Sequence, residues 1–143
     1  MLDAVLLVLA ILSSVFQLVV STVIIYYKIK SKQLGLKMVT NYWFDYLPHV
    51  LFGFSLLFII YSLTHFDTSV LGIIIALTGA FIFNMEILLY NRDYIYLITF
   101  PFKKEKFNSL RRQDKLYIIE GAKSQKILNF PKSKTKKLTL LLK

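Results

Sequence analysis

Two polar residues within the long apolar stretches of this chain could exchange protons. Glu86 is the only charged residue between Asp67 and Arg92, and His49 lies four residues after Asp45. A carboxylate and an imidazole that meet in a medium of low dielectric titrate near neutral pH, as a proton relay or an ion-binding element requires. The alternative is structural, either an interfacial pair that anchors two helices or a glutamate that extends to the headgroups. We favour the structural interpretation.

Gln17 is a third polar departure, because it lies near the middle of the first apolar stretch. An amide that is buried without a partner costs free energy, so we expect Gln17 to hydrogen-bond to a neighbouring helix. A role in the passage of a substrate is the alternative.

Three apolar stretches must position these residues. About 20 apolar residues suffice for a helix to cross a hydrocarbon core of about 30 Å, and all three stretches meet this length. The sequence therefore predicts an α-helical polytopic membrane protein, with three transmembrane helices followed by a small basic β-rich cytoplasmic tail. The predicted transmembrane domain covers residues 1–92, with spans at about 4–27, 46–65 and 69–91, and the tail covers residues 93–143.

The composition agrees with a membrane protein and offers little for catalysis. Hydrophobic residues make up 56% of the chain, above the roughly 45–50% of soluble domains. The absence of cysteine excludes disulfides, thiolate metal sites and a cysteine nucleophile. No phosphate-binding or hydrolase motif is present, and His49 and His65 fall at opposite ends of one predicted span. We therefore predict a protein that is not an enzyme and that needs no cofactor or metal.

The distribution of charge predicts the orientation in the membrane. Residues 1–90 have a net charge of zero, and the whole +10 belongs to residues 91–143. Loop 28–46 carries four lysines, whereas the N-terminus and the turn at 66–68 carry none. Under the positive-inside rule, the N-terminus lies outside the cell membrane and the tail in the cytoplasm. The first stretch lacks the basic start of a signal peptide, so we expect a retained span.

Small residues predict how the helices pack, because membrane helices associate where their backbones approach closely. The residues spaced for one helix face are Gly72, Ala76, Gly79 and Ala80 in the third stretch, and Ser14 and Ser21 in the first. We expect both faces to point toward the interior of the bundle. Chance occurrence of small residues is the alternative.

The tail contains strand patterns and clusters of basic residues. Residues 94–100 and the pair 115–120 and 125–130 are typical of strands, the last two joined as a hairpin at 121–123. Lysines and arginines close to a membrane are attracted to the anionic inner leaflet. Candidate lipid-surface residues are Lys103, Lys104, Lys106, Arg111, Arg112, Lys132, Lys134, Lys136 and Lys137. Nucleic acid is disfavoured as a partner, because few aromatic residues accompany these clusters.

The basic strands that follow the spans, with Phe107 to Asp114 between Phe102 and Tyr117, resemble the bacterial pleckstrin-homology-like modules. Some small membrane proteins that carry such modules confer immunity to bacteriocins. The resemblance covers at most residues 91–143 and transfers no site residue.

These observations predict a non-enzymatic multi-pass membrane protein, of a composition typical of AT-rich bacterial genomes. Its basic cytoplasmic module would bind a membrane partner or an anionic lipid surface, in immunity to a membrane-active peptide or as an accessory subunit. A second copy of the chain is a further candidate partner. The alternative function is an oligomeric small transporter or channel subunit that uses Gln17 and Glu86.

Overall fold

The computed structural model describes residues 1–100, 102–113, 116–128 and 130, and the chain divides into two compact units. The helical unit consists of Met1–Ile25 and Asp45–Asn84. The sheet unit consists of the described residues of Tyr26–Phe44 and Met85–Lys143. Each unit is built from two separate stretches of chain, unlike the predicted division between residues 92 and 93.

Helix α1 is the longest element and covers Leu2–Leu34. Its 33 residues correspond to about 50 Å at 1.5 Å per residue, well beyond the hydrocarbon thickness of about 30 Å. The helix ends at Gly35, whose φ of 68° lies in the left-handed region that glycine tolerates best. The Leu36 N–H donates to the Ser31 carbonyl over 2.8 Å, which is the bond that typically closes such a helix end.

Helix α2 covers Leu47–His65 and is followed by a short helical segment in place of the expected third span. This segment consists of helix α3, Leu71–Leu77, and one π-helical turn, η1, Thr78–Ile82. Its 12 residues extend about 18 Å, well short of a membrane crossing. Both α1 and α2 are long and apolar enough to span a membrane. The prediction of three transmembrane helices is therefore wrong.

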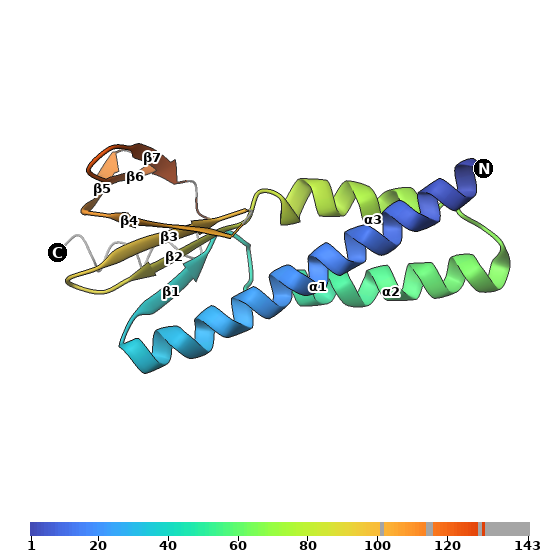
Figure 1. The fold of residues 1–143 in the computed structure, drawn as a ribbon, viewed down its shortest axis with the longest axis horizontal. Helices are drawn as coiled ribbons and strands as arrows, with labels where there is room; N and C mark the ends of the chain where they lie inside the picture. The colour runs from blue at the N-terminus through green and yellow to red at the C-terminus, as the bar shows by residue number, and fades with distance from the viewer. Residues whose placement is uncertain (101, 114–115, 129, 131–143) are drawn as a thin grey trace. The chain divides into compact units, whose positions relative to one another are not determined.

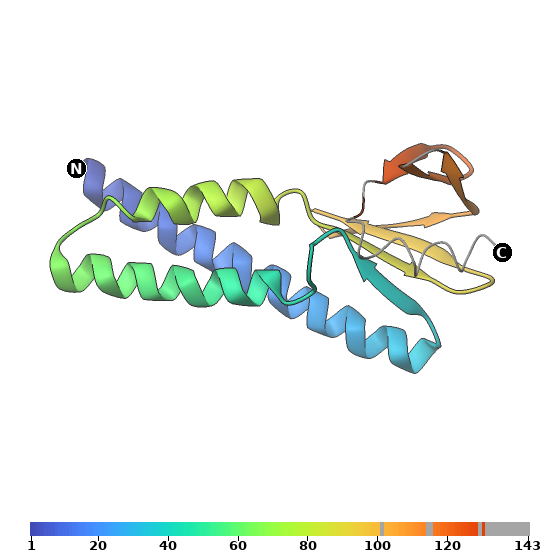
Figure 2. The ribbon, with the colours of Figure 1, turned by 180° about the vertical axis from the view of Figure 1, so that it is seen from behind.

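The helical unit buries polar residues and exposes apolar ones. Helices α2 and α3 both lie beside α1 (Figures 1 and 2), and Ala10 packs against Leu71 and Ile74. Buried polar residues of the unit are Ser13, Ser14, Gln17, Ser21, Ser55, Ser62 and Thr78. Large apolar residues exposed on α1 include Val8, Ile11, Leu12, Val15 and Val19. A soluble helical bundle would instead expose most of its polar residues and bury most of its large apolar ones.

The sheet unit begins with a four-stranded antiparallel sheet in the order β1-β2-β3-β4. The strands are β1 Lys37–Thr40, β2 Glu86–Tyr90, β3 Ile95–Thr99 and β4 Lys103–Phe107. Because β1 pairs with β2, both ends of the helical stretch 45–84 connect to neighbouring strands. Asn91 closes the turn from β2 to β3, where its Oδ1 accepts the N–H groups of Asp93 and Tyr94.

A second antiparallel sheet has the order β5-β6-β7, with β5 Ser109–Gln113, β6 Leu116–Glu120 and β7 Gln125–Leu128. The two sheets share one apolar core, since buried side chains from both belong to a single cluster. This cluster comprises Val39, Leu88, Tyr90, Leu97, Phe107, Tyr117, Ile119, Leu128 and Phe130. The strand expected at 94–100 and the hairpin expected at 115–130 are confirmed within the described residues. The sequence also predicts a further strand at 137–142, and this prediction lies outside the described residues.

Candidate anion-binding site

The hairpin of β3 and β4 displays two lysines above two tyrosines. Side chains alternate along β4, so Phe107 enters the core while Lys104 and Lys106 point to the other face. The Lys104 Nζ lies 4.5 Å from the centre of the Tyr96 ring, and the Lys106 Nζ lies 5.2 Å from that of Tyr94. The two rings stack, with centroids 6.0 Å apart. Each exposed cation–π contact contributes about 0.5–1 kcal/mol, so the lysines are held over the rings.

A cleft of about 500 Å³ lies between β4 and the turn from β6 to β7. It is lined by four lysines and a single acidic residue, together with the small residues of the turn. The lining residues are Lys103, Glu105, Lys106, Gly121, Ala122, Lys123, Ser124 and Lys126. Lys106 belongs both to this cleft and to the tyrosine face. We call the surface formed by these eight residues the lysine cleft.

Glu105 links the two sheets across the lysine cleft. Its Oε1 lies 3.2 Å from the Lys103 Nζ, and its Oε2 lies 3.3 Å from the Lys126 Nζ. The bond to Lys103, and then the one to Lys126, holds the pKa of the Glu105 carboxyl below its ordinary value. One carboxylate cannot neutralise four ammonium groups, so the lysine cleft stays positive. The lysine ammonium groups of such a surface can donate hydrogen bonds to phosphate or carboxylate oxygens.

Gly121 lets the turn approach β4 closely. Its N–H donates to the Ser124 carbonyl over 2.8 Å, and a Cβ at this position would lie 3.3 Å from the Phe107 ring. A side chain there would therefore require the Phe107 ring or the turn to shift by a few tenths of an ångström. The close approach brings Lys123 and Lys126 to the same cleft as Lys103.

The other predicted lipid-surface residues lie elsewhere. Arg111 forms an ion pair with Glu120 across β5 and β6 at 2.9 Å. The Arg112 guanidinium lies 6.0 Å from the centre of the Tyr117 ring. Neither arginine lines the lysine cleft. The predicted residues Lys132, Lys134, Lys136 and Lys137 lie outside the described part of the chain.

The structure adds Lys123, Lys126, Tyr94 and Tyr96 to the site, and none of them was among the residues predicted for it. The predicted hairpin turn at 121–123 was a usable signal for Lys123, since a turn between strands is exposed, whereas Lys126 lies in β7. The tyrosines could be recognised only from the register, which places Tyr96 opposite Lys106.

Glu86 is the first residue of β2 rather than part of a spanning helix. Its N–H donates to the Asn41 Oδ1 over 2.9 Å, and its carbonyl accepts the Asn41 N–H over 3.1 Å. Burial raises the pKa of the Glu86 carboxyl, and the positive charge of Lys126 partly opposes this effect. His49 belongs to α2 in the helical unit, where its ring lies 5.9 Å from that of Tyr46. A Glu86–His49 contact stays a prediction, as does a proton relay.

Gln17 joins three segments of the helical unit. Its Nε2 donates to the Thr78 Oγ1 over 2.8 Å, and its Oε1 accepts the Ser55 hydroxyl over 2.7 Å. Thr78 in turn donates to the Ile74 carbonyl over 2.8 Å. The amide is wholly buried, and both of its ends are hydrogen-bonded.

The small residues expected on interior faces divide into two groups. Ser14 and Ser21 of α1 are buried, and the Ser14 hydroxyl donates to the Ala10 carbonyl over 3.0 Å. In the α3–η1 segment the buried residues are Leu71, Ile74, Thr78 and Ile82, whereas Gly72, Ala76, Gly79 and Ala80 are exposed. The interior therefore takes a different face of this segment from the one that the small residues predicted.

Two further observations concern metal binding and similarity to known proteins. Among the residues that the structure describes, no group of three or more acidic or histidine side chains could hold a metal ion. Comparison of the chain with protein-family models, curated proteins and solved structures found no match.

Proposed function

We propose that this chain is a non-enzymatic membrane protein whose sheet unit binds an anionic lipid surface through the lysine cleft and the adjoining tyrosine face. The observation that carries the proposal is the gathering of Lys103, Lys106, Lys123 and Lys126 around one glutamate. Each lysine near an anionic surface contributes about 1 kcal/mol of attraction. Tyr94 and Tyr96 add rings of the kind enriched at the interface between membrane and water.

The helical unit supports residence in a membrane. Helices α1 and α2 are long and apolar enough to span a membrane. Large apolar side chains cover much of their outer surface, whereas the buried positions of the unit include the polar residues Gln17, Ser55 and Thr78 beside apolar ones. Water would make the exposed apolar surface costly, and lipid removes this cost. The hydrogen bonds of Gln17 offset the cost of burying its amide.

The orientation in the membrane is part of the proposal. The four lysines of loop 28–46 and the basic strands favour a cytoplasmic location for the sheet unit, with the N-terminus and the turn after α2 outside. The chain has no cysteine, so single cysteines at Ser69 and Ala122 are unique labels. We expect an impermeant thiol reagent to label Ser69→Cys in intact cells and Ala122→Cys only after lysis. The reverse pattern contradicts this orientation.

The lipid-binding test uses the full chain in nanodiscs, with a fluorophore on Ala122→Cys that reports the polarity around the lysine cleft. Nanodiscs of phosphatidylcholine alone are compared with nanodiscs that contain phosphatidylglycerol. We expect a blue shift only with the anionic lipid, and we expect Lys104→Gln/Lys106→Gln to reduce it strongly.

The matched control is Lys32→Gln/Lys37→Gln, which removes the same charge from two exposed lysines outside the lysine cleft. We expect it to keep the blue shift. Equal signals in neutral and anionic nanodiscs, or equal losses in the two double variants, contradict lipid binding by this site. An acidic protein partner would then be the next candidate for the lysines.

For the biological role beyond lipid binding, the proposals come from the sequence. Kinship of the sheet unit to pleckstrin-homology-like modules, and immunity to a membrane-active peptide, stay predictions of the sequence. The alternative of a transporter or channel gains no support from Gln17, because both ends of its amide are bonded to neighbouring side chains within one chain.

A further inference from the structure

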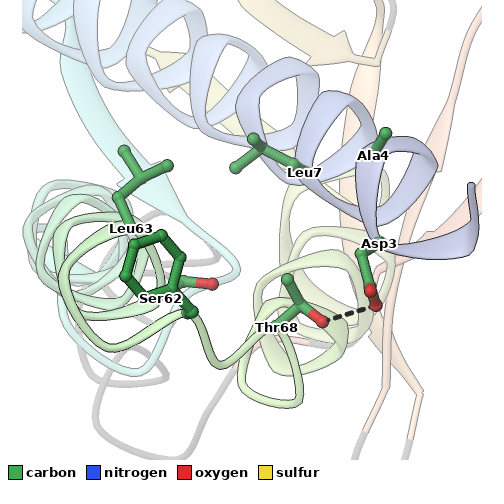
Figure 3. Close-up of a pocket in the computed structure, with 7 residues that line it drawn as sticks. Asp3, Ala4, Leu7, Ser62, Leu63 and Thr68 are labelled. Atoms are coloured by element: carbon green, nitrogen blue, oxygen red, sulfur yellow. Dashed lines mark hydrogen bonds between the residues drawn. The ribbon is translucent and has the colours of Figure 1, made fainter.

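A pocket of about 350 Å³ lies at the end of the helical unit where α1 begins and α2 ends (Figure 3). Asp3, Ala4 and Leu7 come from the first two turns of α1. Ser62 and Leu63 come from the last turn of α2, and Phe66 and Thr68 come from the segment that follows. This volume lies within the range of small-molecule sites, and it holds one four-carbon side chain with space to spare.

The pocket contains one carboxylate and no cation among its lining residues. The Asp3 Oδ1 accepts the Thr68 hydroxyl over 2.8 Å, which fixes the carboxylate at the edge of the pocket (Figure 3). No lysine, arginine or histidine belongs to the described residues that line it. Asp67 adds a second carboxylate to the same segment, and the hydroxyl and N–H of Ser69 hold the pKa of Asp67 below its ordinary value. Asp3 is the only charged residue among the described residues that line the pocket.

Apart from Asp3, Ser62 and Thr68, the lining is apolar and includes a phenylalanine with an uncommon backbone conformation. Ala4, Leu7 and Leu63 form apolar walls beside Asp3. Phe66 has a φ of 53°, in the left-handed region that residues other than glycine rarely adopt. Its side chain is 94% exposed and lines the pocket. An apolar ligand in the pocket would give the ring something to cover.

We propose that this pocket binds an alkylammonium group, with the ammonium at Asp3 and the alkyl chain against Leu7, Leu63 and Phe66. The lysine side chain of a peptide and a free alkylamine share this chemistry. The inference concerns the end of the helical unit and does not depend on lipid binding by the sheet unit.

Solution NMR of the full chain in dodecyl maltoside micelles tests the proposal, because this detergent carries no charge. The probes are Nα-acetyl-lysine amide and n-butylamine, with Nα-acetyl-norleucine amide and n-butanol as their neutral counterparts. We expect saturable shifts of the Asp3 and Thr68 amide signals at millimolar concentrations of an ammonium probe and none with the neutral compounds. Binding of the lysine derivative alone identifies a peptide as the source, and binding of butylamine alone identifies a free amine.

Variants separate ligand binding from the structural role of Asp3. Asp3→Asn keeps the shape of the side chain and should weaken ammonium binding at least tenfold, whereas the exposed Asp93→Asn should leave it unchanged. Thr68→Val removes the hydrogen bond but keeps the carboxylate, so binding should persist. The proposal is overturned if the ammonium probes give no saturable shift, if the neutral compounds bind equally well, or if Asp3→Asn retains full affinity. Loss of binding in Thr68→Val with retention in Asp3→Asn also overturns it.

Discussion

The Gln17 Nε2 donates to the Thr78 Oγ1 over 2.8 Å, although 61 positions separate the two residues in the chain. The same amide accepts a hydrogen bond from Ser55, so one side chain joins α1, α2 and the π-helical turn. A π-helical turn inserts an extra residue into a helix, and here the turn begins at Thr78. The polar contact thus lies where the helical geometry changes.

The hydrogen bonds of Gln17 should contribute measurably to stability. Interhelical hydrogen bonds in membrane proteins contribute about 0.6 kcal/mol on average and up to about 1.7 kcal/mol. We expect Gln17→Leu to lower the free energy of unfolding by about 1–2 kcal/mol, because it also leaves Ser55 and Thr78 without this partner. The measurement is unfolding of the full chain in mixed micelles with increasing SDS.

A double-mutant cycle with Ser55→Ala isolates the bond between the two side chains. We expect a coupling energy of about 0.5–1 kcal/mol between Gln17→Leu and Ser55→Ala. Thr22→Val is the control, because the Thr22 hydroxyl is exposed and bonds only within its own helix, to the Leu18 carbonyl. Additive effects of the two buried substitutions would show that the Ser55–Gln17 bond contributes nothing.

The first two helices could be predicted from the sequence, whereas the third segment could not. Charge-free stretches near residues 4–27 and 46–65 became α1 and α2, because their apolar length leaves few alternatives. Residues 86–90 are also apolar after Glu86, and periodicity cannot separate a buried strand from a buried helix in so short a run. Pairing with β1 and β3 decides in favour of a strand, and this pairing depends on residues far away in the sequence.

Glu86 should make the stability of the protein depend on pH in the acidic range. Burial raises the pKa of its carboxyl in the folded state above the usual value of about 4.3. Its stabilising contribution is therefore fully present below pH of about 4.3 and is lost as the pH rises through the folded-state pKa. We expect the free energy of unfolding of Glu86→Gln to equal that of the wild type in acid and to exceed it at neutral pH.

Thermal unfolding of both proteins at several pH values measures this difference. Asp93→Asn is the control, since Asp93 is an exposed acid of the same unit. A Glu86→Gln variant that is less stable than the wild type at neutral pH would mean that the charged carboxylate is favoured in the folded state.

Glu105 should show the opposite dependence on pH. Its bonds to Lys103 and Lys126 lower the pKa of its carboxyl, so its contribution is present above pH of about 4.3 and is lost as the pH falls through the folded-state pKa. At neutral pH we expect Glu105→Gln to cost a few tenths of a kcal/mol, because solvent screens these ion pairs. The same variant should bind anionic lipid more tightly, since it leaves the four lysines unopposed. Weaker lipid binding would mean that Glu105 mainly positions Lys103 and Lys126.

From the sequence, the basic charge of the candidate site could be predicted, but the grouping of its residues into one cleft could not. The sequence places basic residues throughout the tail, and β4 supplies three of those predicted, namely Lys103, Lys104 and Lys106. The grouping of lysines into one cleft depends on the close approach of Gly121 to Phe107, which brings a turn of one sheet against a strand of the other. Contacts of this kind arise from tertiary packing and leave no periodic signal in the sequence.

Lipid binding by the lysine cleft should be sensitive to salt. Exposed charges are screened over about 10 Å at 0.1 M salt and over about 3 Å at 1 M. We expect the blue shift of the label on Ala122→Cys in anionic nanodiscs to decline steadily between these concentrations. Lys123→Gln removes one lysine, whose attraction to an anionic surface is about 1 kcal/mol. We expect this variant to weaken binding about fivefold at low salt and to have little effect at high salt. A signal that does not change with salt would indicate that apolar contacts, rather than the lysines, hold the sheet unit at the membrane.

Phe66 should be replaceable by glycine with a gain in stability. It follows the last residue of α2 with a φ of 53° and a ψ of 31°, a conformation that costs residues other than glycine about 1–2 kcal/mol. Its side chain is exposed, so Phe66→Gly removes little packing, although the greater freedom of glycine in the unfolded chain offsets part of the gain. We expect a net increase of about 0.5–1 kcal/mol in the free energy of unfolding, measured in mixed micelles with SDS. Phe66→Ala keeps the strained backbone and is the matched control, for which we expect no gain. If the ring contacts a ligand as proposed, Phe66→Gly should also weaken alkylammonium binding, so that stability and affinity change in opposite directions.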